Sequence, residues 1–138
     1  MQTAAAIAHE LEASPEVTRV VYPGLSSYPH REVAERLLPA ERGGAMVSFV
    51  VAGGDERARL LMRHLTLATE ATSLGGVETL ISAPFNSSHY LMSSDERAAV
   101  GIAPGMLRLS VGLEEADTLI ADFETALRAT AVSEMFAH

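Results

Sequence analysis

The spacing of apolar residues along the chain predicts alternating helices and strands. Helical spacing, with apolar residues three and four positions apart, occurs over residues 1–13, 31–38, 95–100 and 114–128, and in a further helix that starts at Asp55. Apolar runs rich in β-branched residues predict strands over residues 17–22, 46–51, 67–72, 77–82 and 107–111. Strands separated by helices and joined by short connections predict an α+β domain of two layers. We expect a mostly antiparallel or mixed sheet with its helices on one face.

The residues at the helix ends refine this prediction. Asp55 is expected to cap one helix, and Ser93 or Ser94 another, because short polar side chains accept hydrogen bonds from the first free amides. The predicted buried stripe of the helix after Asp55 consists of Ala58, Leu61, Met62 and Leu65. The apolar residues of the helix over 31–38 gather on one face, namely Val33, Ala34 and Leu37.

Composition narrows the class of protein. With 138 residues the chain has the length of one domain, and its net charge of −8 argues against nucleic acid, which requires a basic face. No apolar run reaches the roughly 20 residues that a bilayer span needs. The first residues lack the basic segment of a secretory signal. We therefore expect a cytoplasmic protein that contacts neither membrane nor nucleic acid.

Cysteine and lysine are both absent, and their absence excludes several kinds of chemistry. The chain has no cysteine, so it forms no disulfide, thiolate metal site or thiol nucleophile. All ten basic residues are arginines, because lysine is also absent. Without a lysine the chain offers no side-chain amine for a Schiff base with an aldehyde cofactor or a carbonyl substrate.

Common catalytic and metal-binding motifs are also missing. No two of the five histidines have the i,i+4 spacing of a zinc-binding helix, and no Gly-x-Ser-x-Gly sequence occurs. The glycine pairs at 43–44, 53–54 and 75–76 lack the setting or the lysine of a phosphate-binding loop. We interpret all three pairs as turns, and we predict no metal site.

Two segments remain unexplained by folding alone. The pair Gly75-Gly76 follows Ser73 closely, which indicates backbone that is left-handed or too crowded for a Cβ atom. Arg108 interrupts an apolar strand, where burying a guanidinium is costly unless it meets an anion such as a carboxylate. The alternative interpretation is that Arg108 faces solvent on an edge strand or pairs with an internal carboxylate such as Glu78. The pattern alone leaves these alternatives open.

These two segments carry a resemblance to a known family. The run Ser73–Leu80 resembles the Ser-Leu-Gly-Gly-x-Glu-Ser/Thr-Leu sequence of the Cys/Met-metabolism (transsulfuration) enzymes, and Leu107–Glu114 resembles their Arg-Leu-Ser-Val-Gly-x-Glu sequence. Two earlier segments, Val21–Leu25 and Gly43–Phe49, are similar to the family's Tyr-Pro-Gly-Leu and Gly-Gly-Met-x-Ser-Phe sequences. The resemblance covers roughly Ala4 to Leu127 in collinear order.

The resemblance implies a fold and a domain organisation. It corresponds to the small C-terminal domain of a fold-type I enzyme that uses pyridoxal 5′-phosphate (PLP). Residues 1–14 would be the tail of an interdomain helix and residues 15–138 the small domain, while the large PLP-binding domain is absent. The complete enzyme would carry PLP on a lysine of that large domain, so this chain would bind no cofactor covalently and would be inactive alone.

The resemblance also implies roles for individual residues. Arg108 matches the arginine that binds the substrate α-carboxylate, and Ser73 matches a serine beside that carboxylate. Thr72 and Leu74 flank Ser73 and complete the expected substrate-binding set. Many members of the family have Glu where this chain has Thr72. A neutral Thr72 would not bind the distal amino group of a cystathionine-like substrate as a carboxylate would, which argues against cystathionine specificity. Reactions on methionine, cysteine or a homoserine ester, and the choice between lyase and synthase, are left open.

Partners follow from the same resemblance. A domain without its large partner exposes the apolar surface that the partner would cover, so we expect a large PLP-binding domain or subunit and homo- or hetero-oligomers. The alternative is a non-catalytic subunit or binding module that keeps the fold as a partner surface. An unrelated two-layer α+β ligand-binding domain would lack these collinear motifs.

Overall fold

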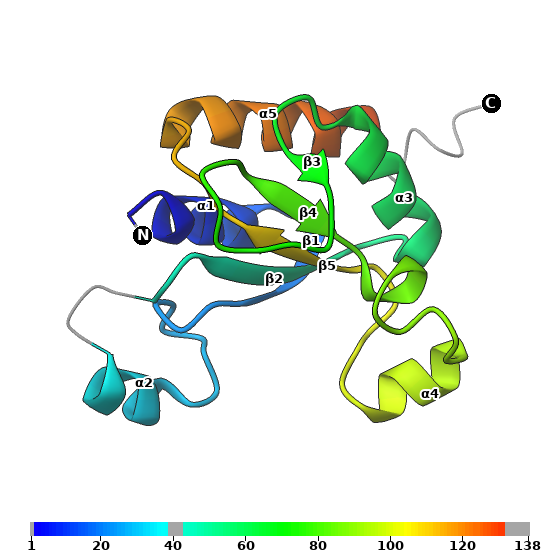
Figure 1. Cartoon of the computed structure of the whole chain (residues 1–138), viewed down its shortest axis with the longest axis horizontal. Helices are drawn as coiled ribbons and strands as arrows, with labels where there is room; N and C mark the ends of the chain where they lie inside the picture. The colour runs from blue at the N-terminus through cyan, green and yellow to red at the C-terminus, as the bar shows by residue number, and fades with distance from the viewer. Residues whose placement is uncertain (1, 39–42, 132–138) are drawn as a thin grey trace.

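A computed structural model describes residues 2–38 and 43–131, and its elements follow the predicted order (Figure 1). The helices are α1 (Gln2–Ala13), α2 (Arg31–Leu37), α3 (Gly54–His64), α4 (Ser94–Ala99) and α5 (Ala116–Ala129), with a 3₁₀ turn over Pro84–Asn86. The strands are β1 (Val17–Val21), β2 (Met46–Val51), β3 (Thr69–Glu70), β4 (Leu80–Ser82) and β5 (Met106–Ser110). No helix in these residues is long and apolar enough to cross a bilayer.

The five strands form one mixed sheet in the order β1-β2-β5-β4-β3. β5 lies at its centre and pairs antiparallel with β2 and β4, β1 pairs antiparallel with β2, and β3 pairs parallel with β4. The predicted α+β class with a mostly antiparallel or mixed sheet is therefore confirmed.

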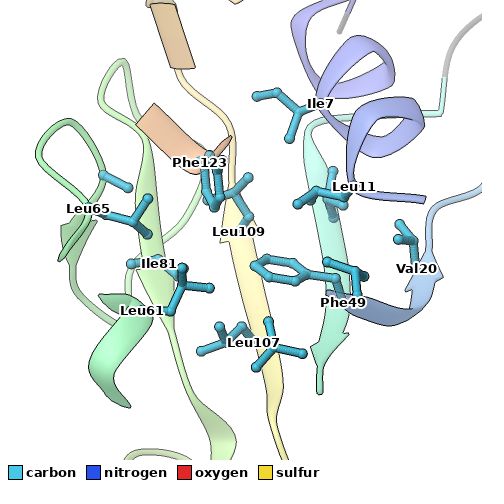
Figure 2. Packing of buried hydrophobic residues seen from close by; sticks show 14 of the residues in the cluster. Ile7, Leu11, Val20, Phe49, Leu61, Leu65, Ile81, Leu107, Leu109 and Phe123 are labelled. Atoms are coloured by element: carbon cyan, nitrogen blue, oxygen red, sulfur yellow. The ribbon is translucent and has the colours of Figure 1, made fainter. Parts of the chain in front are cut away.

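One face of the sheet carries the hydrophobic core. Alternate residues of a strand point to opposite faces, so Leu107 and Leu109 of β5 point together toward the helices (Figure 2). α1, α3 and α5 cover this face, and Phe123 of α5 meets Phe49 of β2 edge to face with ring centroids 6.0 Å apart. The remaining helices, α2 and α4, have no buried residue and lie apart from this layer (Figure 1).

The exposure of α2 differs from the sequence prediction of an apolar face. Val33 is 44% exposed and Leu37 72% exposed, because the described residues place no element over this seven-residue helix. Arg31 instead attaches α2 to the preceding loop through a hydrogen bond to the Gly24 carbonyl, and it forms an ion pair with Glu35 within the helix. Apolar spacing identified the helix correctly but did not identify what its face meets.

Helix caps agree with the prediction at one of the two sites. Ser93 forms a capping box with Glu96 at the start of α4, as expected. Asp55 was wrongly predicted as a cap, because the N-cap of α3 is Gly53, with φ +102°. The Asp55 carboxylate instead accepts from the Gly105 amide at 2.8 Å and lies 3.4 Å from Arg97, so it joins α3 to the approach to β5.

Strands β3 and β4 are shorter than predicted, and α5 begins later. The residues between β3 and β4 leave the sheet to form an exposed loop over 72–78. Glu114, predicted as the start of the last helix, precedes α5 and binds this loop instead. In this region the side chains of Arg108, Ser110 and Glu114 bond to residues 72–79, and the segment between β3 and β4 does not extend the sheet.

Two buried polar side chains stabilise the rest of the domain. Tyr22 is 1% exposed and donates its hydroxyl to the Gly44 carbonyl, and burial raises the pKa of this phenol. A Cβ atom on Gly24 or Gly43 would come within 2.7 Å or 2.6 Å of the Tyr22 ring, so both positions require glycine. Arg57 is fully buried in α3 and donates to the Leu127 carbonyl of α5 at 3.0 Å.

Candidate functional site

The sheet face opposite the helices carries a row of polar residues centred on Arg108. Arg108 of β5 is in register with Ser48 of β2 and with Ser82 of β4. Because its neighbours Leu107 and Leu109 point into the core, Arg108 points to this opposite face. It lies on the central strand, so the alternative of an edge strand is wrong.

The loop between β3 and β4 lies against this row and brings the predicted site residues together. Arg108 donates from Nη2 to the Thr72 carbonyl at 2.7 Å and to the Ser73 carbonyl at 3.4 Å. Ser110, which shares the Arg108 face of β5, accepts a hydrogen bond from the Gly75 amide at 3.0 Å. Arg108 and Ser110 thus hold the segment 72–75 from two points on one strand.

Arg108 therefore meets backbone carbonyls in this structure rather than an anion. Within residues 2–38 and 43–131 no carboxylate lies within ion-pair distance of it, so the predicted alternative of a pair with Glu78 is not found. In the same residues its Nη1 and Nε groups have no protein acceptor. The guanidinium keeps unused donors, and a carboxylate is the ligand that best matches them.

The side chains of the predicted set are accessible. Thr72, Ser73 and Leu74 are all exposed, Leu74 to 57%. Gly75 has φ +76°, which explains the first glycine of the pair, but Gly76 has open space around it and no positive φ. The prediction of crowded or left-handed backbone is thus correct for Gly75 and wrong for Gly76.

A second set of contacts fixes the other end of the loop. Glu114 accepts from the Thr79 amide through Oε2 at 3.0 Å and from the Thr79 hydroxyl through Oε1 at 2.8 Å. The Thr79 oxygen in turn accepts from the Gly112 amide at 3.0 Å. Sequence reasoning missed Thr79 and Glu114 as partners. The available signal was that both residues belong to the family motifs, Thr79 to the run Ser73–Leu80 and Glu114 to the run Leu107–Glu114.

These contacts act on the ionisation of Glu114. Partial burial raises the pKa of its carboxyl, but the hydrogen bonds from Thr79 outweigh burial, so the pKa lies below the ordinary value of 4.5. A carboxyl whose folded-state pKa is depressed stabilises the fold fully above its unfolded-state pKa. That contribution disappears as the pH falls through the lower, folded-state value.

We expect Glu114→Gln to destabilise the domain near pH 7 and to lose this effect in acid. The difference in unfolding free energy between wild type and variant should shrink as the pH falls from 4.5 through the lower folded-state pKa of Glu114, because the wild-type carboxylate then loses its charge. Urea denaturation at a series of pH values measures the difference. A gap that stays constant down to the acid limit of folding would contradict the assignment.

Gly112 is the point where the end of β5 meets the loop most closely. A Cβ atom at this position would collide with the Val77 carbonyl oxygen and the Glu78 carbonyl carbon, both of them backbone. We expect Gly112→Ala to displace the loop and to destabilise the domain by about 2 kcal/mol, within the range for overpacking. Urea denaturation measures the cost. Gly76→Ala is the matched control, since a Cβ atom there meets nothing within 4 Å.

A shallow polar hollow adjoins the site. Its volume is ≈ 470 Å³. It is lined by Glu70, Ala71, Thr72, Ser82, Asn86 and Ser87. Thr72 and Ser82 connect it to Arg108.

A larger hollow of ≈ 590 Å³ between α1 and α5 contains none of the predicted site residues. The described residues contain no group of three or more side chains suited to a metal ion.

Comparison with known sequences agrees with the motifs. A family model described as Cys/Met metabolism PLP-dependent enzyme matches residues 1–128. An L-methionine gamma-lyase of Treponema denticola is 44% identical over 121 residues, which cover 88% of this chain and 30% of the relative. A cystathionine gamma-lyase of Dictyostelium discoideum is 41% identical over 126 residues, covering 91% and 32%. The chain therefore spans about a third of these curated relatives.

Solved structures agree in fold. Cystathionine gamma synthase from Xanthomonas oryzae pv. oryzae, in complex with aminoacrylate and cysteine, superposes with a TM-score of 0.83 at 40% identity. The match covers 94% of this chain and 33% of that one. A putative O-acetylhomoserine (thiol)-lyase from Campylobacter jejuni gives a TM-score of 0.85 at 31% identity, covering 92% and 30%.

Proposed function

Because the chain belongs to the Cys/Met metabolism family of PLP-dependent enzymes, we propose that it is the small C-terminal domain of such an enzyme and binds the α-carboxylate of its amino-acid substrate. Residues 1–14 would lead in from the large domain, and residues 15–138 would form the small one. The observation that carries the proposal is Arg108, which sits at the centre of the open sheet face with donors to spare.

The geometry supports a binding role with an orienting effect. A guanidinium with free N–H groups holds a carboxylate by paired hydrogen bonds, which fixes direction as well as position. The two acceptors that Arg108 uses in the described residues are the carbonyls of Thr72 and Ser73, so the bound carboxylate would lie beside the exposed Ser73 side chain. Holding a substrate in one orientation lowers the entropic part of a reaction barrier.

PLP does not fit this chain as a covalent ligand. The chain has no lysine, so it offers no side-chain amine to the cofactor aldehyde. The cofactor would belong to a large domain supplied by the rest of the protein or by another subunit. In the proposal, the residues of this chain bind and orient the substrate, and they carry out no step of the bond-breaking chemistry.

Exposed apolar residues around the site support such a large-domain partner. Leu74, Val77 and Leu113 are 57%, 68% and 81% exposed, and the Leu113 amide donates to the Val77 carbonyl, which keeps two of them adjacent. An exposed apolar rim beside a polar site is typical of a surface that another domain covers. The neutral Thr72 in this rim favours substrates without a distal ammonium group, such as methionine, cysteine or a homoserine ester.

Reconstitution tests the proposal. The chain is mixed with the polypeptide that carries the cofactor lysine, and complex formation and turnover of sulfur amino acids are measured. We expect each part alone to be inactive and the mixture to be active. Turnover by this chain alone, or an active partner that neither binds it nor gains from it, would contradict the proposal.

A further inference from the structure

We propose that Glu114, acting through the Thr79 hydroxyl, is a positioning residue that sets where the segment 72–75 lies over Arg108. The inference rests on the proposed function, because it concerns the site at which Arg108 would bind a carboxylate. Its evidence is separate, since it comes from how the loop between β3 and β4 is attached.

The loop has no apolar anchor of its own. Residues 72–78 are all exposed, and the first buried residue after them is Thr79, at 0% exposure. Packing therefore does not determine the path of this loop. Its position depends on polar contacts, and most of these come from the β5 strand and the four residues that follow it, with the Thr69 amide of β3 donating to the Thr79 carbonyl at 3.0 Å.

The contacts at Thr79 use every polar atom available there. Both Glu114 oxygens accept, one from the Thr79 amide and one from its hydroxyl. Since that hydroxyl proton points at Glu114, the lone pairs of the same oxygen face the Gly112 amide. Such a network orients all its members together, and removing the carboxylate releases the hydroxyl as well as the amide.

The effect reaches the site through a short connection. One turn separates Thr79 from Thr72 and Ser73, whose carbonyls Arg108 contacts. In this turn the Gly75 amide donates to Ser110, and the Val77 carbonyl accepts from the Leu113 amide. Displacement at Thr79 therefore moves the Thr72 and Ser73 carbonyls that orient the guanidinium. Arg108 would keep its charge but lose its fixed direction.

Amide hydrogen exchange of the chain, followed by NMR, tests this inference. We expect Glu114→Gln to speed exchange at Thr79 and Gly112 and also at Gly75 by about tenfold, the factor for loss of a contact worth about 1.4 kcal/mol. The Arg108 Nε resonance should shift in the same variant. Glu115→Gln is the matched control, because Glu115 is exposed and its side chain makes no capping bond.

Two further variants separate positioning from general loss of structure. Thr79→Val removes the hydroxyl and should reproduce the changes at Gly75 and Arg108, whereas Thr79→Ser keeps the hydroxyl and should restore wild-type values. Slow exchange at the core amides of Phe49 and Leu107 shows that the variants remain folded. Changes confined to Thr79 and Gly112, with Gly75 and Arg108 unaltered, would overturn the inference, as would failure of Thr79→Ser to restore them.

Kinetics of the reconstituted pair distinguish this inference from the proposed function. Loose positioning of Arg108 should raise the KM for a sulfur amino acid more than it lowers kcat. If the wild-type pair proves inactive, the proposed function fails, while the exchange data still decide whether Glu114 positions the loop. If the pair is active and Glu114→Gln leaves both exchange at Gly75 and KM unchanged, only the positioning role fails.

Discussion

Replacing Arg108 by alanine should lower kcat/KM of the reconstituted enzyme on the order of 10- to 100-fold, because a hydrogen bond to a charged group contributes about 1.5–3 kcal/mol. The loss should be larger for the amino acid than for its ester or amide, which have no carboxylate to bind. Steady-state kinetics with both substrates measure this difference.

Two further variants of Arg108 distinguish its binding of a carboxylate from its attachment of the loop at Thr72. Arg108→Gln is neutral but still carries an N–H group for the Thr72 carbonyl, so it should lose as much activity as alanine if the carboxylate is the ligand. Arg108→Lys keeps the positive charge but lacks the paired N–H groups of a guanidinium, so its kcat/KM should lie between those of wild type and Arg108→Ala. Arg19, an exposed arginine on the edge strand β1, serves as the control for removing a positive charge. Equal losses for acid and ester would show that Arg108 acts only on the loop.

The second large effect concerns stability and arises at Arg57. This residue is fully buried in α3, pairs with Glu16 at 2.6 Å, and donates to the carbonyls of Ala52 and Leu127 at 3.0 Å each. It therefore joins α3 to the segment before β1 and to the end of α5. Its Nε is buried without a partner, so the contacts of the two terminal nitrogens must offset that cost.

We expect Arg57→Met to lower the free energy of unfolding by about 3 kcal/mol, since methionine fills the space but leaves buried carbonyls without donors. Glu16→Gln should cost less, because the Glu16 side chain is 30% exposed and the two carbonyl contacts remain. Urea denaturation of the chain measures both values. A loss no greater for Arg57→Met than for Glu16→Gln would show that the carbonyl contacts contribute little.

The sequence predicted the fold well where the spacing of apolar residues alone distinguishes a helix from a strand. Apolar spacing predicted the order of the helices and strands and the α+β class, but it left the surroundings of Arg108 open. The structure shows that Leu107 and Leu109 are buried and that Arg108 donates to the Ser73 carbonyl. The comparisons confirm the family. The substrate-binding roles of Arg108, Ser73, Thr72 and Leu74 remain predictions, which the variants above are designed to test.

What the pattern missed depends on contacts between distant segments. Asp55 and Glu114 both stood at expected helix starts, yet each carboxylate bonds to backbone amides of another segment. Local preference cannot distinguish a capping carboxylate from one that reaches a neighbouring loop, because both need the same residue type in the same place. Likewise, the spacing in α2 defines an apolar face without stating whether anything covers it.

The central place of β5 in the sheet has a consequence for how the domain assembles. β2 and β4 both precede β5 in the sequence, yet each pairs with β5. Phe49 of β2 pairs with Leu107, and Ile81 of β4 pairs with Leu109, so neither ladder can form before β5 has been synthesised. During synthesis on the ribosome, the first four strands would emerge with the middle of their sheet missing. Such non-local pairing is slow and leaves strand edges open to wrong partners. The strand that presents Arg108 is thus also the one that completes the sheet.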